Sequence, residues 1–142
     1  MKVERSAILP FSAADMFDVV ADIESYPDFL EWCHQSQIES RQENEIVGRL
    51  DIRYRKLNIS FTTSNINLRP ESIEIRLKKG PFSNLSGNWQ FIALGESACK
   101  VSVTMNFKFL NPVTGMMLNG LFEQLVVSQI SAFELRAKQL YG

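Results

Sequence analysis

The feature that most constrains this chain is a long stretch of alternating apolar and polar residues, from about residue 35 to residue 109. Within residues 46–55 one set of side chains is apolar and the other is mostly charged: Ile46, Leu50, Ile52 and Tyr54 against Arg49, Asp51, Arg53 and Arg55. The alternation recurs in four later segments: 57–63, 73–77, 85–93 and 101–109. Successive side chains of a strand point to opposite faces, so this pattern predicts an antiparallel sheet with one apolar face.

Helical patterns flank the predicted sheet. Residues 2–9 indicate a short strand, and Ser12 is suited to cap a helix over residues 13–21. Asn111-Pro112 is a typical helix start, and a broad apolar stripe at helical spacing then continues to Tyr141. The stripe consists of Leu118, Leu121, Phe122, Leu125, Val126, Ile130, Phe133, Ala137 and Leu140.

These elements predict an α+β fold in which a curved antiparallel sheet of about six to seven strands wraps around a long C-terminal helix. The 142 residues suit a single domain spanning residues 1–142. A net charge of −1 implies no general affinity for polyanions. With no signal-peptide pattern, no long apolar run and only two widely separated cysteines, we expect a cytoplasmic protein.

The stretch from Tyr26 to Cys33 is unusually apolar for a connection between elements. We expect Pro27 to push Tyr26 out of the α-helical region and to interrupt the preceding helix. A connection with this much apolar surface either plugs one end of the core or forms the rim of an apolar pocket. Because this connection adjoins a sheet with one open apolar face and a helix that packs on it, we favour the interpretation that it forms the rim of a pocket. We expect Trp32 to line that pocket.

Three blocks of residues together resemble one protein family. They are Tyr26-Pro27-x-Phe29-Leu30-x-Trp32-Cys33, then Gly80-Pro81-Phe82 with Leu85, Gly87, Trp89 and Phe91, and finally Ala132-Phe133-Glu134-x-Arg136-Ala137-x-x-Leu140-Tyr141-Gly142. In this order they resemble the motifs of the RatA / coenzyme Q-binding protein family of the START-like (polyketide cyclase and lipid-transport) superfamily. Glu31 stands where that family usually has proline.

The resemblance implies the START-like helix-grip fold and one of two activities. Some members are described as binding ubiquinone or a related polyprenyl lipid and supporting respiration. Some bacterial members are described as toxins that bind the large ribosomal subunit and block subunit association. We expect non-catalytic binding of an apolar small molecule such as ubiquinone, with at most peripheral membrane contact. The alternative is a RatA-type toxin that inhibits translation.

The residues give little support to catalysis. No nucleophile, P-loop, zinc-protease or dinucleotide motif is present. Cys33 and His34 are neighbours in sequence, but nucleophilic catalysis needs a base and an orienting group that converge in space. One histidine and two scattered cysteines form no recognisable metal site. We therefore expect no enzymatic activity, cofactor or metal, although START-like relatives include cyclases.

Aromatic and flexible apolar side chains are the candidates for lining a ligand pocket. We predict a ligand-binding set of Phe29, Trp32, Phe61, Phe82, Trp89, Phe91, Phe107, Met117, Leu121 and Phe122. Most aromatic residues on a buried face are simply core, and Phe61 and Phe107 are the members most open to that interpretation. Gly87, two positions before Trp89, leaves a gap that indicates either a bend in the sheet or room for a ligand.

Two further segments carry open alternatives. Gly115 and Gly120 bracket two methionines, which predicts either a frayed helix start or a mobile gate over the pocket. Arg49, Arg53, Arg55 and Lys56 form a basic row that is either a solvated sheet face or a contact to ribosomal RNA.

Overall fold

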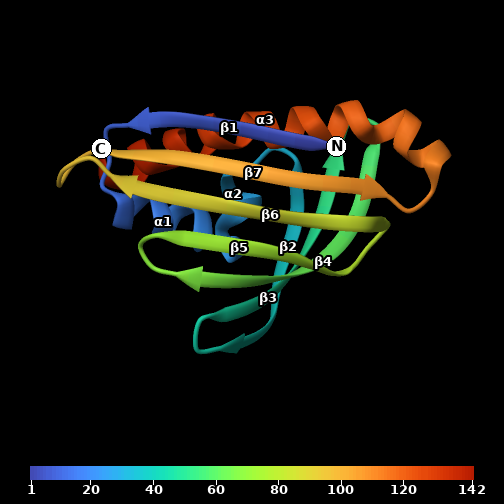
Figure 1. Ribbon diagram of the computed structural model, residues 1–142, viewed down its shortest axis with the longest axis horizontal. Coiled ribbons are helices and arrows are strands. Elements are labelled where there is room, and N and C mark those ends of the chain that lie inside the picture. Colours follow the sequence, from blue (N-terminus) through green and yellow to red (C-terminus); the bar gives the residue numbers. More distant parts are fainter.

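The computed structural model describes residues 1–142 and consists of one curved sheet, one long helix and three short helical segments (Figure 1). The strands are β1 (Lys2–Leu9), β2 (Cys33–Gln42), β3 (Glu45–Tyr54), β4 (Leu57–Leu68), β5 (Ser72–Lys79), β6 (Phe82–Ala93) and β7 (Cys99–Phe109). The helices are α1 (Ala13–Ala21), the 3-10 turn η1 (Ile23–Ser25), α2 (Tyr26–Phe29) and α3 (Pro112–Tyr141).

All seven strands belong to one antiparallel sheet in the order β1-β7-β6-β5-β4-β3-β2. Strands β2 to β7 follow the chain as a continuous meander, and β1 joins the sheet beside β7. The sheet therefore begins and ends with strands β1 and β2, which α1, η1 and α2 connect. The predicted α+β helix-grip architecture is confirmed.

The concave face of the sheet packs against α3 and α1, as Figure 1 shows. Alternate residues of the strands point into this layer, as the period of two predicts. In β7 the buried positions are Cys99, Val101, Val103, Met105, Phe107 and Phe109. These residues belong to a hydrophobic core of 32 buried residues to which the helices contribute Met16, Phe17, Phe122 and Phe133.

The helix starts agree with the predicted caps. The Asp15 backbone N–H donates to Ser12 Oγ at 3.1 Å. The Asn111 side-chain oxygen accepts from the backbone N–H of Val113 at 2.9 Å and of Thr114 at 3.4 Å. These contacts satisfy N–H groups that have no partner within a helix. The 30 residues of α3 span about 45 Å at 1.5 Å per residue.

The expected effect of Pro27 on Tyr26 is wrong. Tyr26 adopts helical angles, φ −52° and ψ −44°, and α2 runs through the proline. Proline is tolerated there because it lies in the first turn, where its missing N–H would have no helical partner. Tyr26, Leu30, Trp32 and Cys33 are all buried, so this segment is part of the core.

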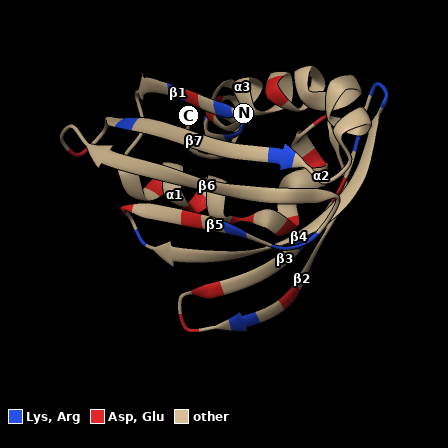
Figure 2. Cartoon of the chain, turned by 45° about the vertical axis from the view of Figure 1, so that its right-hand side comes forward, with Lys and Arg blue, Asp and Glu red and all other residues tan.

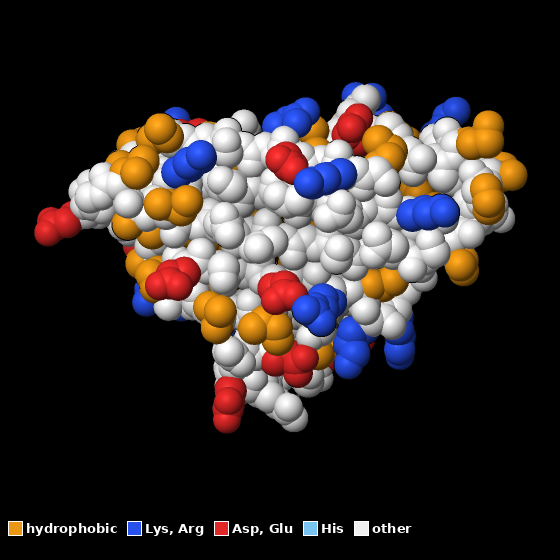
Figure 3. All heavy atoms as spheres, viewed as in Figure 1, with side chains coloured by type: hydrophobic (Ala, Val, Ile, Leu, Met, Phe, Trp, Pro, Cys, Tyr) orange, Lys and Arg blue, Asp and Glu red, His pale blue; other side chains and the backbone are white.

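The convex face of the sheet faces solvent and is largely polar. Figure 3 shows mainly backbone and side chains that are neither charged nor hydrophobic over its centre, with charged side chains scattered around them and hydrophobic groups gathered toward the two ends. No helix of the structure is long and apolar enough to cross a membrane.

Candidate functional site: a small cavity between sheet and helix

A cavity lies inside the layer between the sheet and α3. Its wall contains residues from α3, from β3 to β7 and from the Tyr26–Cys33 segment. The lining residues are Ile23, Tyr26, Trp32, Gly48, Leu50, Ile52, Phe61, Thr63, Asn65, Ile75, Leu85, Trp89, Met105, Phe122, Leu125, Val126 and Gln129. The position of this cavity agrees with the pocket expected from the sequence.

The cavity is small, with a volume of about 60 Å³. Sites for drug-sized ligands commonly occupy roughly 300–1,000 Å³. A water molecule takes about 30 Å³ of liquid volume, so the cavity in this form has room for a few small atoms and not for a polyprenyl chain. A larger guest requires side chains or α3 to move.

Four members of the predicted ligand set line this cavity: Trp32, Phe61, Trp89 and Phe122. Phe122 is central to the aromatic packing, with its ring centroid 4.7 Å from that of Phe107 and 5.3 Å from that of Phe82. The four come from separate segments of the chain and meet because the sheet curves around α3.

The other six members of the predicted set lie outside the cavity wall: Phe29, Phe82, Phe91, Phe107, Met117 and Leu121. Phe82 stacks on Phe109 with centroids 4.7 Å apart, and Phe91 stacks on Trp89 at 6.3 Å. Met117 is 68% exposed to solvent. These side chains fill the core or face solvent in this form.

The gap predicted at Gly87 is occupied. A Cβ atom at Gly87 would lie 2.7 Å from Sδ of Met105, its partner on β7. Gly87 therefore leaves space for the methionine side chain, which itself lines the cavity. Met has flexible torsions and adapts to irregular space, so Met105 is the wall residue best suited to rearrange.

Polar residues of the wall are the part that sequence reasoning missed. Thr63 and Asn65 lie at inward positions of β4, and Thr63 Oγ1 donates to Asn65 Oδ1 at 2.9 Å. Gln129 lies within the buried stripe of α3, between Leu125 and Phe133. A polar residue at an apolar position of a periodic pattern is the signal that would have identified all three.

Two buried polar atoms of the wall have no hydrogen-bond partner: Nε1 of Trp32 and Oε1 of Gln129. Leaving a buried polar group unpaired costs about 1–3 kcal/mol. Such atoms are uncommon in folded proteins. Four occur in this structure, and these two of the four line the cavity.

Cys33 and Tyr26 are held in their neutral forms. Burial, with the nearby carboxylate of Asp51 as a second cause, raises the pKa of the Cys33 thiol to about 11. The reactive species of a cysteine is the thiolate, so this thiol is inert at neutral pH. Burial likewise raises the pKa of Tyr26, whose hydroxyl donates to the backbone oxygen of Val20. His34 is exposed.

The predicted basic row divides into two parts. Arg49 Nε lies 3.1 Å from Asp51 Oδ1, so its charge is largely compensated. Arg53, Arg55 and Lys56 are exposed, and none of them takes part in an ion pair of the structure. We call these three residues the basic hairpin tip, because they surround the tight turn between β3 and β4. Figures 1 and 2 place this turn beside the first turns of α3.

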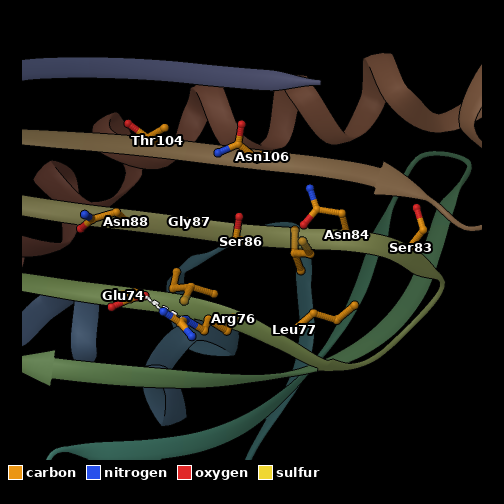
Figure 4. Close-up of a pocket in the computed structure, with 12 residues that line it drawn as sticks. Glu74, Arg76, Leu77, Ser83, Asn84, Ser86, Gly87, Asn88, Thr104 and Asn106 are labelled. Atoms are coloured by element: carbon orange, nitrogen blue, oxygen red, sulfur yellow. Dashed lines mark hydrogen bonds and ion pairs between the residues drawn. The ribbon is translucent and has the colours of Figure 1, made fainter.

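A second depression lies on the convex face over β5, β6 and β7 (Figure 4). Its labelled side chains are mainly amides and hydroxyls: Ser83, Asn84, Ser86, Asn88, Thr104 and Asn106. The one cation there, Arg76, donates to Glu74 Oε1 at 2.9 and 2.6 Å, so its charge is compensated. The side chains that line this surface are therefore mainly uncharged or charge-compensated.

The family is decided by a match to a family model. The model described as polyketide cyclase / dehydrase and lipid transport matches residues 9–134. The chain belongs to this family. Within the family it resembles the Ribosome association toxin RatA of Pseudomonas aeruginosa, with 42% identity over 99% of this chain and 97% of that protein.

More distant matches include a coenzyme Q-binding protein and a solved structure with the same fold. The Coenzyme Q-binding protein COQ10 homolog B, mitochondrial, of Xenopus laevis is 24% identical over all of this chain and 60% of that protein. The crystal structure of the Zhui aromatase/cyclase from Streptomyces sp. R1128 superposes with a TM-score of 0.85 at 20% identity, covering 98% of this chain and 94% of that chain. The predicted RatA / coenzyme Q-binding relationship within the START-like group is confirmed.

Proposed function

We propose that this protein associates with the ribosome and inhibits translation without catalysing a reaction. The observation that carries this proposal is the 42% identity, over nearly the whole chain, to a protein named as a ribosome association toxin. A ribosomal target also implies a cytoplasmic location. This ranks the ribosome above the quinone, which the sequence motifs had placed first.

The basic hairpin tip supports this proposal. Arg53, Arg55 and Lys56 project from a turn and have no acidic partner to compete with an RNA phosphate. Arginine and lysine supply most of the phosphate contacts that hold proteins on nucleic acids. Arg55 also lies over the Tyr54 ring, 5.3 Å from its centroid, which limits the positions of its guanidinium.

Co-sedimentation with isolated large ribosomal subunits tests the proposal. The wild-type chain should pellet with the subunits at low salt and be released at high salt, because phosphate contacts depend on counterions. Replacing Arg53 and Lys56 together by glutamate should weaken binding at least tenfold and lower the salt slope by about 2.

A charge-matched control lies at another part of the sheet. Arg5 and Lys100 are exposed on β1 and β7, and their replacement by glutamate changes the net charge by the same amount. This control should bind like the wild type. Absence of wild-type binding at low salt would refute ribosome association, and equal loss in both double variants would refute the role of the tip.

A second candidate function is binding of an apolar guest in the cavity. It is favoured by the 13 hydrophobic residues among the 17 that line the cavity, and by the two unpaired polar atoms in the same wall. The distant relative from Xenopus laevis is named as a coenzyme Q-binding protein, and coenzyme Q is a quinone. Organic extraction of gently purified protein, followed by mass spectrometry, should yield a stoichiometric apolar compound; an empty extract would count against this candidate. The two functions use different faces and are compatible.

A further inference from the structure

We infer that Trp32 and Gln129 form a polar recognition pair that selects an uncharged guest with an oxygen-bearing head, such as a phenol or quinol ring, and rejects anionic lipids. This inference rests on the second candidate function above, and it adds the chemical class of the guest.

Trp32 supplies a hydrogen-bond donor that nothing in the protein uses. Its indole is 5% exposed, and Nε1 has no partner. The ring of Tyr26 holds it at a centroid distance of 6.3 Å in an edge-on arrangement. An indole N–H only donates, so the atom that satisfies it must be an acceptor such as a hydroxyl or carbonyl oxygen.

Gln129 supplies the complementary acceptor. It is 9% exposed, and its Oε1 atom has no partner. Phe133, one turn further along α3, lies 5.4 Å from the Tyr26 ring that also contacts Trp32. Trp32 and Gln129 both line the same small cavity, so the two unpaired groups border one space. A hydroxyl group satisfies both, because it accepts from one partner and donates to the other.

The absence of charged residues from the cavity wall determines the rejection of anions. No lysine, arginine, histidine, aspartate or glutamate is among the lining residues. A carboxylate or phosphate brought into this wall would lose its hydration without gaining a counterion, which is costly. The other polar pair, Thr63 and Asn65, is already hydrogen-bonded internally. The cavity therefore favours neutral guests.

Space is the remaining requirement. The cavity of about 60 Å³ is smaller than the roughly 150 Å³ that accepts benzene in an engineered protein cavity. Met105 occupies the room beside Gly87 and lines the cavity, so rotation of its side chain is the simplest way to enlarge it. Met105→Ala removes that side chain beyond Cβ and provides the room directly.

The experiment compares phenol, toluene and benzoate, which have one ring each and differ in the group attached. Affinities are measured by calorimetry and by the indole N–H signals of the two tryptophans in nitrogen-15 NMR, for the wild type and for Met105→Ala. Apolar burial alone would favour toluene over phenol. We expect phenol to bind five- to tenfold more tightly than toluene, which is the effect of one or two net hydrogen bonds, and benzoate not to bind. The Trp32 indole N–H signal should move downfield with phenol and not with toluene.

Two variants test the pair and one serves as the control. Trp32→Phe removes the indole N–H and leaves a smaller aromatic ring, and Gln129→Met replaces the amide by an apolar side chain of similar length. Each should abolish the preference for phenol. Gln129→Met should also raise the melting temperature of the empty protein, because it removes an unpaired buried group. Gln124→Met makes the same substitution as Gln129→Met at an exposed position of α3 outside the wall, and it should keep the preference.

The outcomes separate the inference from the function on which it rests. If toluene binds as tightly as phenol, or if benzoate binds, the cavity accepts guests but the recognition pair is refuted. The pair is also refuted if Gln129→Met lowers the melting temperature and leaves the preference unchanged. If none of the three compounds binds even to Met105→Ala, both the pair and the apolar-guest function are overturned.

Discussion

Around Phe133, α3 is clamped by aromatic rings, whereas in its first ten residues only Gly115 is buried. The Phe133 ring lies 5.4 Å from Tyr26, 5.8 Å from Phe29 and 5.4 Å from Trp89 between centroids. At the other end, Val113, Met116 and Met117 are exposed. The first ten residues of α3 therefore have few contacts with the core, whereas the helix from Phe122 onward is part of it.

The largest effect is expected at the clamped end. Phe133→Ala removes a fully buried ring that touches three other aromatic residues. It should lower the free energy of unfolding by about 3–5 kcal/mol, since truncation of a buried phenylalanine loses burial and leaves a cavity. Urea denaturation followed by circular dichroism measures this. A loss below about 1 kcal/mol would show that the clamp does not hold the helix.

The burial of Cys33 in the Tyr26–Cys33 segment should make the free energy of unfolding depend on pH. The pKa of Cys33 is raised to about 11, against about 8.5 in an unfolded chain. The unfolded state therefore loses this proton first, so the stabilisation is complete below about pH 8.5 and is lost as pH rises toward 11. Over this range wild type should lose up to about 3 kcal/mol more stability than Cys33→Ala. Parallel pH profiles of the two proteins would contradict this.

The loose end should respond in the opposite direction to a helix-favouring change. A Cβ atom at Gly120 would meet nothing within 4 Å, so alanine fits there without strain. Gly120→Ala should raise the free energy of unfolding by up to about 1 kcal/mol, because glycine is a poor helix former. If these turns act as a gate, the same change combined with Gly115→Ala should slow guest exchange in stopped-flow fluorescence. Unchanged exchange rates would refute the hypothesis that these turns act as a gate.

The smallest effect is expected at the exposed methionines. Met117→Ala should change the free energy of unfolding by less than about 0.5 kcal/mol, because the side chain has few contacts to lose. Thermal unfolding of Met117→Ala, measured in parallel with that of Phe133→Ala, compares the two ends of α3 directly. A large loss of stability would mean that the first turns of α3 are as firmly packed as the second half.

The sequence predicted the architecture well because periodicity reports directly on burial. The strand face carrying Ile52 and the helix stripe carrying Leu125, Val126 and Phe133 are buried as expected. The Asn111 cap and the tight turn near Lys56 were also correct. In each case one local physical rule decides the outcome.

The site was harder to predict because it depends on contacts between distant segments. Gly87 suggested empty space, but its neighbour across the ladder, Met105, fills it, and strand register is not readable from one strand. Pro27 suggested a break, although its position in a first turn makes it harmless. Gln129 is one polar residue among many in the sequence, and only the fold places its oxygen in a cavity without a partner.

The two border strands of the sheet have consequences for self-association. An open strand edge is a template for pairing with another chain. On one border α3 contacts β1, and on the other β2 has irregular pairing with β3 between Cys33 and Gln35 and between Ile38 and Ser40. Bulges of this kind twist a strand and interrupt the regular row of backbone groups that a second copy would need. The irregular register of β2 therefore protects an otherwise long, solvent-facing border from edge-to-edge aggregation.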